Sequence, residues 1–314
     1  MEGKNTAISK HLEAYPYQIA GHLTQEPLQV TVDGCVLKQV QRPPKGEREV
    51  VFYATVFDKK EEREEILQLR RFLPVYYGIV ELDSSRYLKL ENITTKFRLP
   101  CVMDIKIGKV TWEDDVDESF KERRKRKWPL REIAGFSILG FMVYNHKTSC
   151  YERFMREYCM KLATMEDAER TFCKFMGSVN TEWTLHILEQ LLKKLTEIEE
   201  WFKTQRLYRF IASSILISYE ADCHQNVVGN FTPSNDRPSS FVCQDQSLTD
   251  TVIDSNVSPH LPSTNHQQLL NRTLVDARII DTAHVFTTSD TDFNYLFGLE
   301  NIILTVNCVQ KSFN

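Results

Sequence analysis

Apolar and polar side chains alternate along the first third of the chain, as half-buried strands require. The runs 28–32 and 35–40 are separated by Asp33-Gly34, a dipeptide typical of tight hairpin turns. Two further strand-like runs follow at 74–82 and 86–90. The pattern therefore predicts an antiparallel sheet in this part of the chain.

A helical pattern lies between these pairs of strands. From residue 47 to 57, apolar side chains recur at helical spacing, at Val50, Val51, Ala54 and Phe57. Glu49 lies on this helix, and Lys38 lies on the second strand of the hairpin before it. A strand lysine followed by a helix glutamate is similar to the ion pair that positions nucleotide phosphates in protein kinases. An ordinary surface pair, which contributes only about 0 to 1 kcal/mol, explains the same two residues.

The rest of the chain alternates between strand and helix patterns. Strand-like runs occupy 133–144 and 209–219, and a 3.6-residue apolar period from Leu188 to Phe202 predicts a helix with one buried face. Residues 223–271 are rich in Ser, Asn, Asp, Gln, Thr and Pro and have almost no periodicity, which predicts a disordered insert. The apolar pattern resumes at 274–280.

One apolar strand, at 99–108, carries two opposite charges. Asp104 and Lys106 are two residues apart, so strand geometry places both side chains on the same face. A carboxylate beside an ammonium suits acid–base chemistry next to a phosphate, and Gly108 ends the strand where a ligand can approach the backbone. A solvated edge with two surface ion pairs fits the spacing equally well.

Three segments resemble those of the inositol polyphosphate kinase family. All fixed positions of its P-x-x-x-D-x-K-x-G signature are present, at Pro100, Asp104, Lys106 and Gly108. Residues 209–216 resemble its S-S-L-L segment, and residues 280–285 resemble its I-D-F-A-H-V segment. Thr282 stands where an aromatic residue is usual, and Asn294 where glycine is usual. The motifs occur in the family's order, and among its branches the chain resembles the multikinases.

The resemblance implies an α+β, two-lobed fold of the ATP-grasp or protein-kinase-like type, with an antiparallel N-lobe sheet and a larger mixed C-lobe. The implied divisions are a flexible N-terminus (1–15), an N-lobe (16–93), a C-lobe with a substrate-binding helix near 115–128 (94–222), the disordered insert (223–271) and the completion of the C-lobe (272–314).

The resemblance also implies an ATP- and Mg²⁺-dependent kinase that phosphorylates hydroxyls of soluble inositol tris- and tetrakisphosphates towards the pentakisphosphate. Phosphoinositide lipid as a further acceptor is left open. The alternatives are an inositol trisphosphate 3-kinase, an inositol hexakisphosphate kinase, and a catalytically silent scaffold. Residues 109–134 leave no room for the larger substrate-binding insert of the trisphosphate 3-kinases, and the retained polar motif residues argue against a scaffold.

Individual residues take their roles from the family. Asp104 and Lys106 would be catalytic, orienting the attacking hydroxyl and neutralising the transferred phosphoryl group. The nucleotide-binding residues would be Lys38, Glu49, Glu91, Ile93, Asp104, Ser213, Ser214 and Asp281. Asp281 and Ser214 would hold Mg²⁺, which prefers hard oxygen ligands. The substrate-binding residues would be Lys106, Arg123, Arg124, Lys127 and His284.

The charge pattern after Gly108 fits a phosphate-binding helix. Acidic residues at 113–118 precede basic residues at 121–127, an order that suits the helix macrodipole. Arg123 and Arg124 are four and three residues from Lys127, so three cations can face one point. A charge-assisted hydrogen bond to phosphate contributes about 1.5 to 3 kcal/mol. A solvated face or a nuclear-localisation cluster has the same composition.

Amino-acid composition and charge limit the class of protein further. Of the 314 residues, 42% are hydrophobic and 26% charged, as in soluble globular proteins, and the net charge of −4 argues against general nucleic-acid binding. The sequence shows neither an apolar run of about 18 residues nor a signal-peptide pattern. Eight cysteines without a C-x-x-C are typical of reduced thiols. We expect a monomer in the nucleus and cytoplasm that binds ATP and inositol polyphosphates, without nucleic acid or a membrane span.

Overall fold

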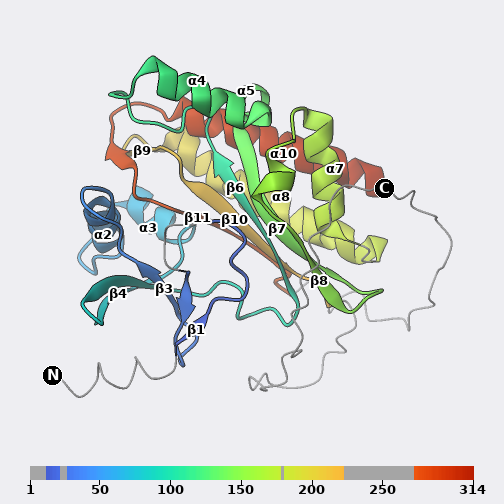
Figure 1. The fold of residues 1–314 in the computed structure, drawn as a ribbon, viewed down its shortest axis with the longest axis horizontal. Coiled ribbons are helices and arrows are strands. Elements are labelled where there is room, and N and C mark those ends of the chain that lie inside the picture. The colour runs from blue at the N-terminus through green and yellow to red at the C-terminus, as the bar shows by residue number, and fades with distance from the viewer. Residues whose placement is uncertain (1–11, 22–26, 178–179, 223–271) are drawn as a thin grey trace.

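The computed structural model describes residues 12–21, 27–177, 180–222 and 272–314. Within these ranges the chain forms two five-stranded sheets and one two-stranded sheet. In Figure 1 the smaller five-stranded sheet lies at the lower left, and the larger one runs diagonally through the centre. This division corresponds to the two predicted lobes.

The N-lobe sheet is antiparallel throughout, with the order β1-β2-β3-β5-β4. Its strands are β1 (Glu13–Ala14), β2 (Gln29–Val30), β3 (Val36–Gln39), β4 (Tyr76–Leu82) and β5 (Ser85–Leu90). The predicted hairpin is present, with Val30 opposite Val36. Its connection is longer than two residues, because the Thr31 N–H donates to the Cys35 carbonyl and closes a wider turn. Gly34 has a φ of 80° there, a conformation that glycine adopts without strain.

The predicted first helix is α2 (Lys45–Val56), which is followed by α3 (Glu64–Arg70). Its buried face differs from the prediction: Val51 and Ala54 are exposed, whereas Phe52, Tyr53 and Val56 are buried. These three residues continue a stripe that begins at Glu49, itself fully buried. The buried face of this helix includes a polar residue, so a prediction from apolar positions alone selects the wrong face.

The N-terminal boundary also differs from the prediction of a flexible segment over 1–15. Glu13 pairs with Val30 in the sheet, and the Tyr15 ring is buried with its hydroxyl 3.3 Å from Oγ1 of Thr94. Residues 12–15 are ordered by these contacts, while residues 1–11 lie outside the described ranges.

The larger sheet is also antiparallel, with the order β11-β10-β6-β7-β8. Its strands are β6 (Pro100–Ile107), β7 (Phe136–Asn145), β8 (Cys150–Phe154), β10 (Ser214–Glu220) and β11 (Val275–Ile280). Tyr219 lies opposite Val275, so the chain leaves and re-enters this sheet at adjacent positions. The predicted insert, 223–271, falls between them and lies outside the described residues. The short strands β9 (Tyr208–Phe210) and β12 (Val285–Thr287) pair separately.

The strand predicted at 133–144 begins later than expected. The helix α5 (Pro129–Ala134) occupies its first residues, since Pro129 is favourable at the start of a helix. Gly135 then ends the helix with a φ of 67°. The strand β7 therefore starts only at Phe136.

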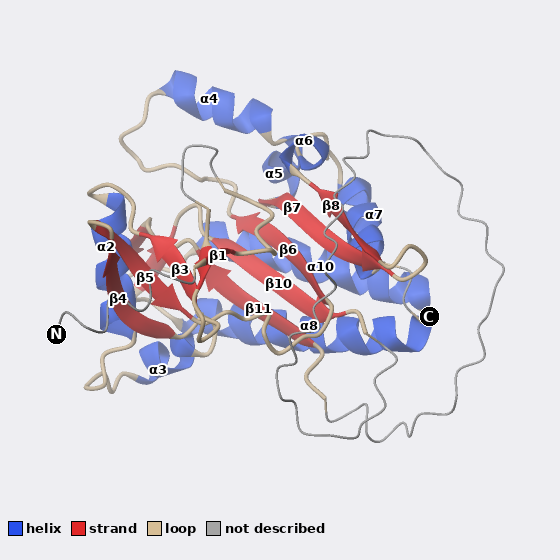
Figure 2. Ribbon diagram, turned by 60° about the horizontal axis from the view of Figure 1, so that its bottom comes forward, coloured by secondary structure: helices blue, strands red, loops and turns tan. Residues whose placement is uncertain are grey.

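Long helices cover one face of the larger sheet. In Figure 2, α8 (Thr181–Thr204) and α10 (Phe293–Phe313) lie behind its strands. The predicted apolar face of α8 is confirmed, with Leu188, Leu191 and Leu195 fully buried, and the Phe202 and Tyr295 rings stack at 3.9 Å between the two helices. The remaining helices are α4 (Glu118–Lys127), α6 (Arg156–Cys159) and α7 (Met165–Met176). No helix in the described ranges is long and apolar enough to span a membrane.

Candidate active site

Asp104 and Lys106 lie on β6, the middle strand of the larger sheet. Strand β10 pairs on one side, where Ser214 lies opposite Lys106, and β7 pairs on the other, where Ser137 lies opposite Lys106. Nζ of Lys106 donates to the Ala212 carbonyl at 2.8 Å. Asp104 is buried and Lys106 half-buried on a central strand, so the alternative of a solvated sheet edge is excluded for them.

Burial makes both groups chemically unusual. Burial, and next the charge of Asp281, raise the pKa of Asp104 to about 7, although Lys106 opposes them. Oδ1 of Asp104 has no hydrogen-bond partner within the described part of the chain. Burial lowers the pKa of Lys106. A carboxyl with a pKa near neutrality can take a proton from an acceptor hydroxyl, and its unpaired oxygen leaves a position for that hydroxyl.

Lys38 connects the two lobes. Its Nζ lies 2.7 Å from Oε1 of Glu49 on α2 and 2.7 Å from Oδ1 of Asp281, which follows β11. Burial opposes the charge of Lys38, but Asp281 and Glu49 outweigh it and raise the pKa of Lys38. The predicted Lys38–Glu49 pair is thus a buried pair, since the Glu49 side chain is only 1% exposed.

Asp281 and two serines lie beside this pair. Ser213 and Ser214 are fully buried, and Ser214 lies opposite Ile280, the residue before Asp281. The Asp281 side chain is 43% exposed. Among the described residues, no three His, Cys, Asp or Glu side chains gather as a metal cluster. A carboxylate and a hydroxyl suit Mg²⁺ when nucleotide oxygens supply the other ligands.

The predicted hinge connects β5 to the larger lobe. The Glu91 N–H donates to the Val75 carbonyl, and Oε2 of Glu91 accepts from the Val75 N–H. Asn92 and Thr94 close a turn through the Asn92 side chain. In the described residues, no backbone hydrogen bond uses the Glu91 carbonyl or the Ile93 N–H. These two groups remain available to the edge of an adenine ring.

His284 is held by a residue that sequence reasoning did not assign to the site. Nδ1 of His284 lies 2.6 Å from Oε1 of Glu113, which also accepts from Nη2 of Arg48 at 2.8 Å. Burial lowers the pKa of His284, and Glu113 opposes this effect. In the sequence Glu113 is one of several acidic residues before the basic helix, and its spacing does not distinguish it from Asp114.

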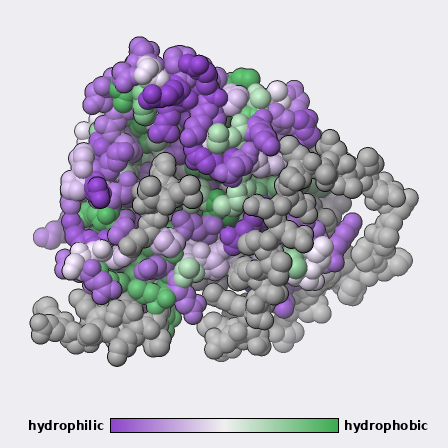
Figure 3. Space-filling view, viewed as in Figure 1, coloured by the Kyte–Doolittle hydropathy of each residue, from purple (hydrophilic) through white to green (hydrophobic). Residues whose placement is uncertain are grey.

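The basic helix α4 lies at the top of Figure 1, and Figure 3 shows hydrophilic residues covering that region. Lys127 is exposed, and its pKa is lowered by the charges of Arg156 and, after burial, of Arg124. Lys125 instead forms an ion pair with Glu122 at 2.7 Å. Arg124 and Lys127 therefore both lie near the positive charge of Arg156.

Arg123 has a different environment from Arg124. Both guanidinium carbons lie near the Phe120 ring, at 5.9 Å from its centre for Arg123 and 5.2 Å for Arg124, but Arg123 is exposed. Arg124 is half-buried, and burial and then the charge of Arg156 lower its pKa. The structure therefore brings Arg124 and Lys127 closer to a common site than Arg123.

Two further cations at this site were missed from the sequence. The guanidinium carbons of Arg131 and Arg156 lie 5.6 and 5.1 Å from the Trp128 ring centre. Arg131 lies just before the strand-like run predicted at 133–144 and was assigned no role. In the structure it lies on α5, a helix that the apolar pattern did not predict.

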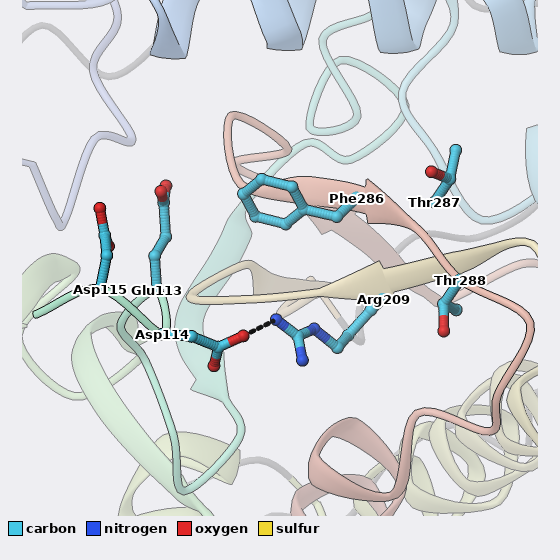
Figure 4. A pocket seen from close by; sticks show the side chains of 7 residues that line it. All are labelled: Glu113, Asp114, Asp115, Arg209, Phe286, Thr287 and Thr288. Carbon is cyan, nitrogen blue, oxygen red and sulfur yellow. Dashed lines mark hydrogen bonds and ion pairs between the residues drawn. The ribbon is translucent and has the colours of Figure 1, made fainter.

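A pocket beside this site is shown in Figure 4. It is lined by Glu113, Asp114, Asp115, Arg209, Phe286, Thr287 and Thr288, and Arg209 pairs with Asp114 at 3.3 Å. Three carboxylates and one guanidinium do not suit a polyphosphate. The candidate active site is therefore the buried Asp104–Lys106 pair together with the cations near α4.

Comparisons with known proteins agree with this geometry. The sequence profile of the family "Inositol polyphosphate kinase" matches residues 87–307. The chain is 33% identical to the inositol polyphosphate multikinase of Rattus norvegicus, over 94% of this chain and 92% of that protein. The chain belongs to the inositol polyphosphate kinase family. It is therefore an ATP-dependent kinase of inositol polyphosphates, and the predicted family and enzyme class are confirmed.

Two other relatives refine this assignment. Inositol hexakisphosphate kinase 3 of Mus musculus is 26% identical over 72% of this chain and 51% of its own length, which favours the multikinase branch. The crystal structure of an inositol phosphate multikinase from S. cerevisiae in complex with ADP and Mn²⁺ has a TM-score of 0.62 at 19% identity, over 87% of this chain and 98% of that chain. This likeness confirms the two-lobed α+β fold of the kinase.

Proposed function

We propose that this kinase transfers the γ-phosphoryl group of ATP to hydroxyls of inositol tris- and tetrakisphosphates and so forms the pentakisphosphate. The observation that carries the proposal is the Asp104–Lys106 pair. Ser214 lies opposite Lys106 on one side and opposite Ile280, the residue before Asp281, on the other. The charge of Asp281 acts on both members of the pair, and Lys106 is affected in addition by Arg131 and Arg124. The pair thus lies within electrostatic reach of both the predicted nucleotide residues and the predicted acceptor residues.

On the nucleotide side, Lys38 would bind the ATP phosphates, oriented by Glu49 and Asp281. The Glu91 carbonyl and the Ile93 N–H would bind the adenine edge. Ser214 and Asp281 would hold Mg²⁺, which when bound neutralises charge on the nucleotide phosphates.

On the acceptor side, Lys127, Arg124 and His284 would grip the phosphates of the inositol, with Arg123 at the periphery. Asp104 would accept the proton of the attacking hydroxyl, and Lys106 would neutralise charge on the transferred phosphoryl group. Catalysis would consist mainly of positioning and charge stabilisation, as in other phosphoryl transfers.

The same helix supports a proposal about location. Arg123, Arg126 and Lys127 are exposed on α4, as a nuclear-import receptor would require. We propose that the kinase is present in both the nucleus and the cytoplasm, and imaging of a fluorescent fusion would test this.

Product analysis tests the proposed activity directly. The purified kinase is incubated with inositol 1,4,5-trisphosphate, ATP and Mg²⁺, and the products are separated by chromatography over time. We expect a tetrakisphosphate and then a pentakisphosphate, and no product with Asp104→Asn. Accumulation of one tetrakisphosphate would identify a trisphosphate 3-kinase, and absence of any product from tris-, tetrakis- or hexakisphosphate would identify a silent scaffold.

A further inference from the structure

Arg131 is a fully buried arginine, only 2% exposed, beside the catalytic strand. Nη2 donates to Oγ of Ser137 at 2.6 Å, and Nη1 donates to Oγ1 of Thr111 at 3.1 Å. Ser137 is the residue opposite Lys106 in the β6–β7 ladder. The guanidinium is therefore fixed directly behind the catalytic lysine.

Arg131 forms no ion pair with a carboxylate among the described residues. In the described residues, no carboxylate lies within ion-pair distance of Arg131, and Glu132, next to it in sequence, lies 3.9 Å from Lys109 instead. Its hydrogen-bond partners are two neutral hydroxyls, and its Nε is buried without a partner. The indole of Trp128 offers one partly compensating contact, which it shares with Arg156.

A buried arginine without an anionic partner destabilises the folded protein, and a bound anion would reduce this effect. A guanidinium cannot lose its proton at neutral pH, so burial cannot neutralise it as it would a lysine. Burial and the charges of Arg124 and Arg156 lower the pKa of Arg131 to about 10, although the charge of Glu132 opposes them. Glu132 thus compensates the buried charge only in part, and an anion bound at the site that Lys106 faces would compensate it further.

We propose that Arg131 sets the charge preference of the acceptor site: its fixed positive charge behind Lys106 favours the more highly phosphorylated inositol. This inference rests on the proposed function. The contribution of a fixed charge to anion binding grows with the charge of the anion, so each additional phosphate gains from Arg131. Arg131 makes no contact with the reacting atoms and is a positioning residue.

The test compares two acceptors that differ by one phosphate. Values of kcat/KM are measured for an inositol trisphosphate and an inositol tetrakisphosphate with wild type, Arg131→Met and Arg131→Lys. We expect Arg131→Met to lower the tetrakisphosphate-to-trisphosphate ratio of kcat/KM by about three- to tenfold, and Arg131→Lys to retain most of the wild-type ratio. The matched control is Arg70→Met, since Arg70 ends α3 and donates to the carbonyls of Val56 and Asp58, away from the site.

A merely structural role gives a different result. If Arg131→Met lowers kcat/KM for both acceptors by the same factor, or leaves both unchanged, the inference is overturned. Arg131→Gln, which can still bond to Ser137, replaces Arg131→Met if the latter does not fold. Calorimetry without ATP measures the binding of both acceptors separately from catalysis. If Arg131→Met changes the ratio of the two affinities but the wild type gives no product, the proposed function is refuted and this inference stands. Failure of the wild type to bind either acceptor would overturn both.

Discussion

Nδ1 of His284 lies 2.6 Å from Oε1 of Glu113, an oxygen that also receives a hydrogen bond from Arg48. An ionised carboxylate only accepts hydrogen bonds, so Nδ1 carries a proton. Nε2 can then donate to a phosphate only when the ring is protonated. Glu113 therefore favours the charged form of His284 while joining it to α2.

Replacing Glu113 with Gln should raise the KM for the inositol phosphate by about three- to tenfold on the acidic side of neutrality, where His284 is protonated in wild type, with little change in the KM for ATP. Removing the anion lowers the pKa of His284 further, so the rise of KM with pH should begin at a lower pH than in wild type. Steady-state kinetics from about pH 5 to 8 measure this. Asp114→Asn is the control, since Asp114 pairs with Arg209 instead; equal effects of the two variants would contradict a specific contact.

From the Lys38 contacts we expect two substitutions, Lys38→Met and Asp281→Asn, to differ in their effect on stability. Lys38→Met leaves the buried Glu49 carboxylate without its cation and should reduce the free energy of unfolding by about 3 kcal/mol. Asp281→Asn, at a half-exposed side chain, should change it by less than about 1 kcal/mol. Both should lose turnover. Urea unfolding and ATP kinetics are the measurements, and adding Glu49→Gln to Lys38→Met should restore stability but not activity.

Asp104 predicts a pH-dependent stability difference. Its pKa is about 7 in the folded kinase against an ordinary value of 3.8, so the folded state binds the proton more tightly than the unfolded chain. The resulting stabilisation is fully present below about pH 4 and is lost as the pH rises to about 7. Relative to Asp104→Asn, wild type should lose up to about 1.4 kcal/mol per pH unit in this window. Urea unfolding at several pH values tests this, and a difference that does not vary with pH would show an ordinary pKa.

Two lysines of α4 form a matched pair for the acceptor site. Lys127→Met should lower kcat/KM for the inositol phosphate by about ten- to a hundredfold, because a charge-assisted phosphate contact is lost. Lys125, which pairs with Glu122, should matter much less. Affinity for ATP should stay within about twofold in both. Equal kinetic losses in the two variants would mean that only the general field of the helix acts.

The sequence predicted the parts of the site that lie on regular strands and helices. Asp104 and Lys106 share a strand face because the strand period determines that arrangement. The contact of Lys38 with Glu49 was expected from its similarity to the kinase ion pair, with a surface pair as the alternative. The residues that were missed reach the site through tertiary packing. Arg131 depends on the Gly135 turn that ends α5, and Glu113 depends on the path of the segment after Gly108.

The two departures from the family pattern have local explanations in the structure. Oγ1 of Thr282 lies 3.5 Å from Oε1 of Glu49, to which the Thr282 N–H also donates at 3.1 Å, so the threonine side chain adds a polar contact to the Lys38 pair. Asn294 bonds to both the N–H and the carbonyl of Val110, which fixes the start of the segment that leads to Glu113. Neither contact could be predicted, since each joins residues far apart in the sequence.

The Lys38–Asp281 ion pair joins residues that are 243 positions apart. During protein synthesis it can therefore form only long after Lys38 has been made. Lys38 and Glu49 leave the ribosome early, whereas Asp281 and the Thr282 N–H are made near the end of the chain. Until then β10 lacks its neighbour β11, and Glu49 lacks a backbone donor. A nascent or prematurely terminated chain therefore lacks part of the proposed nucleotide site, so we expect no turnover of ATP before the larger sheet is complete.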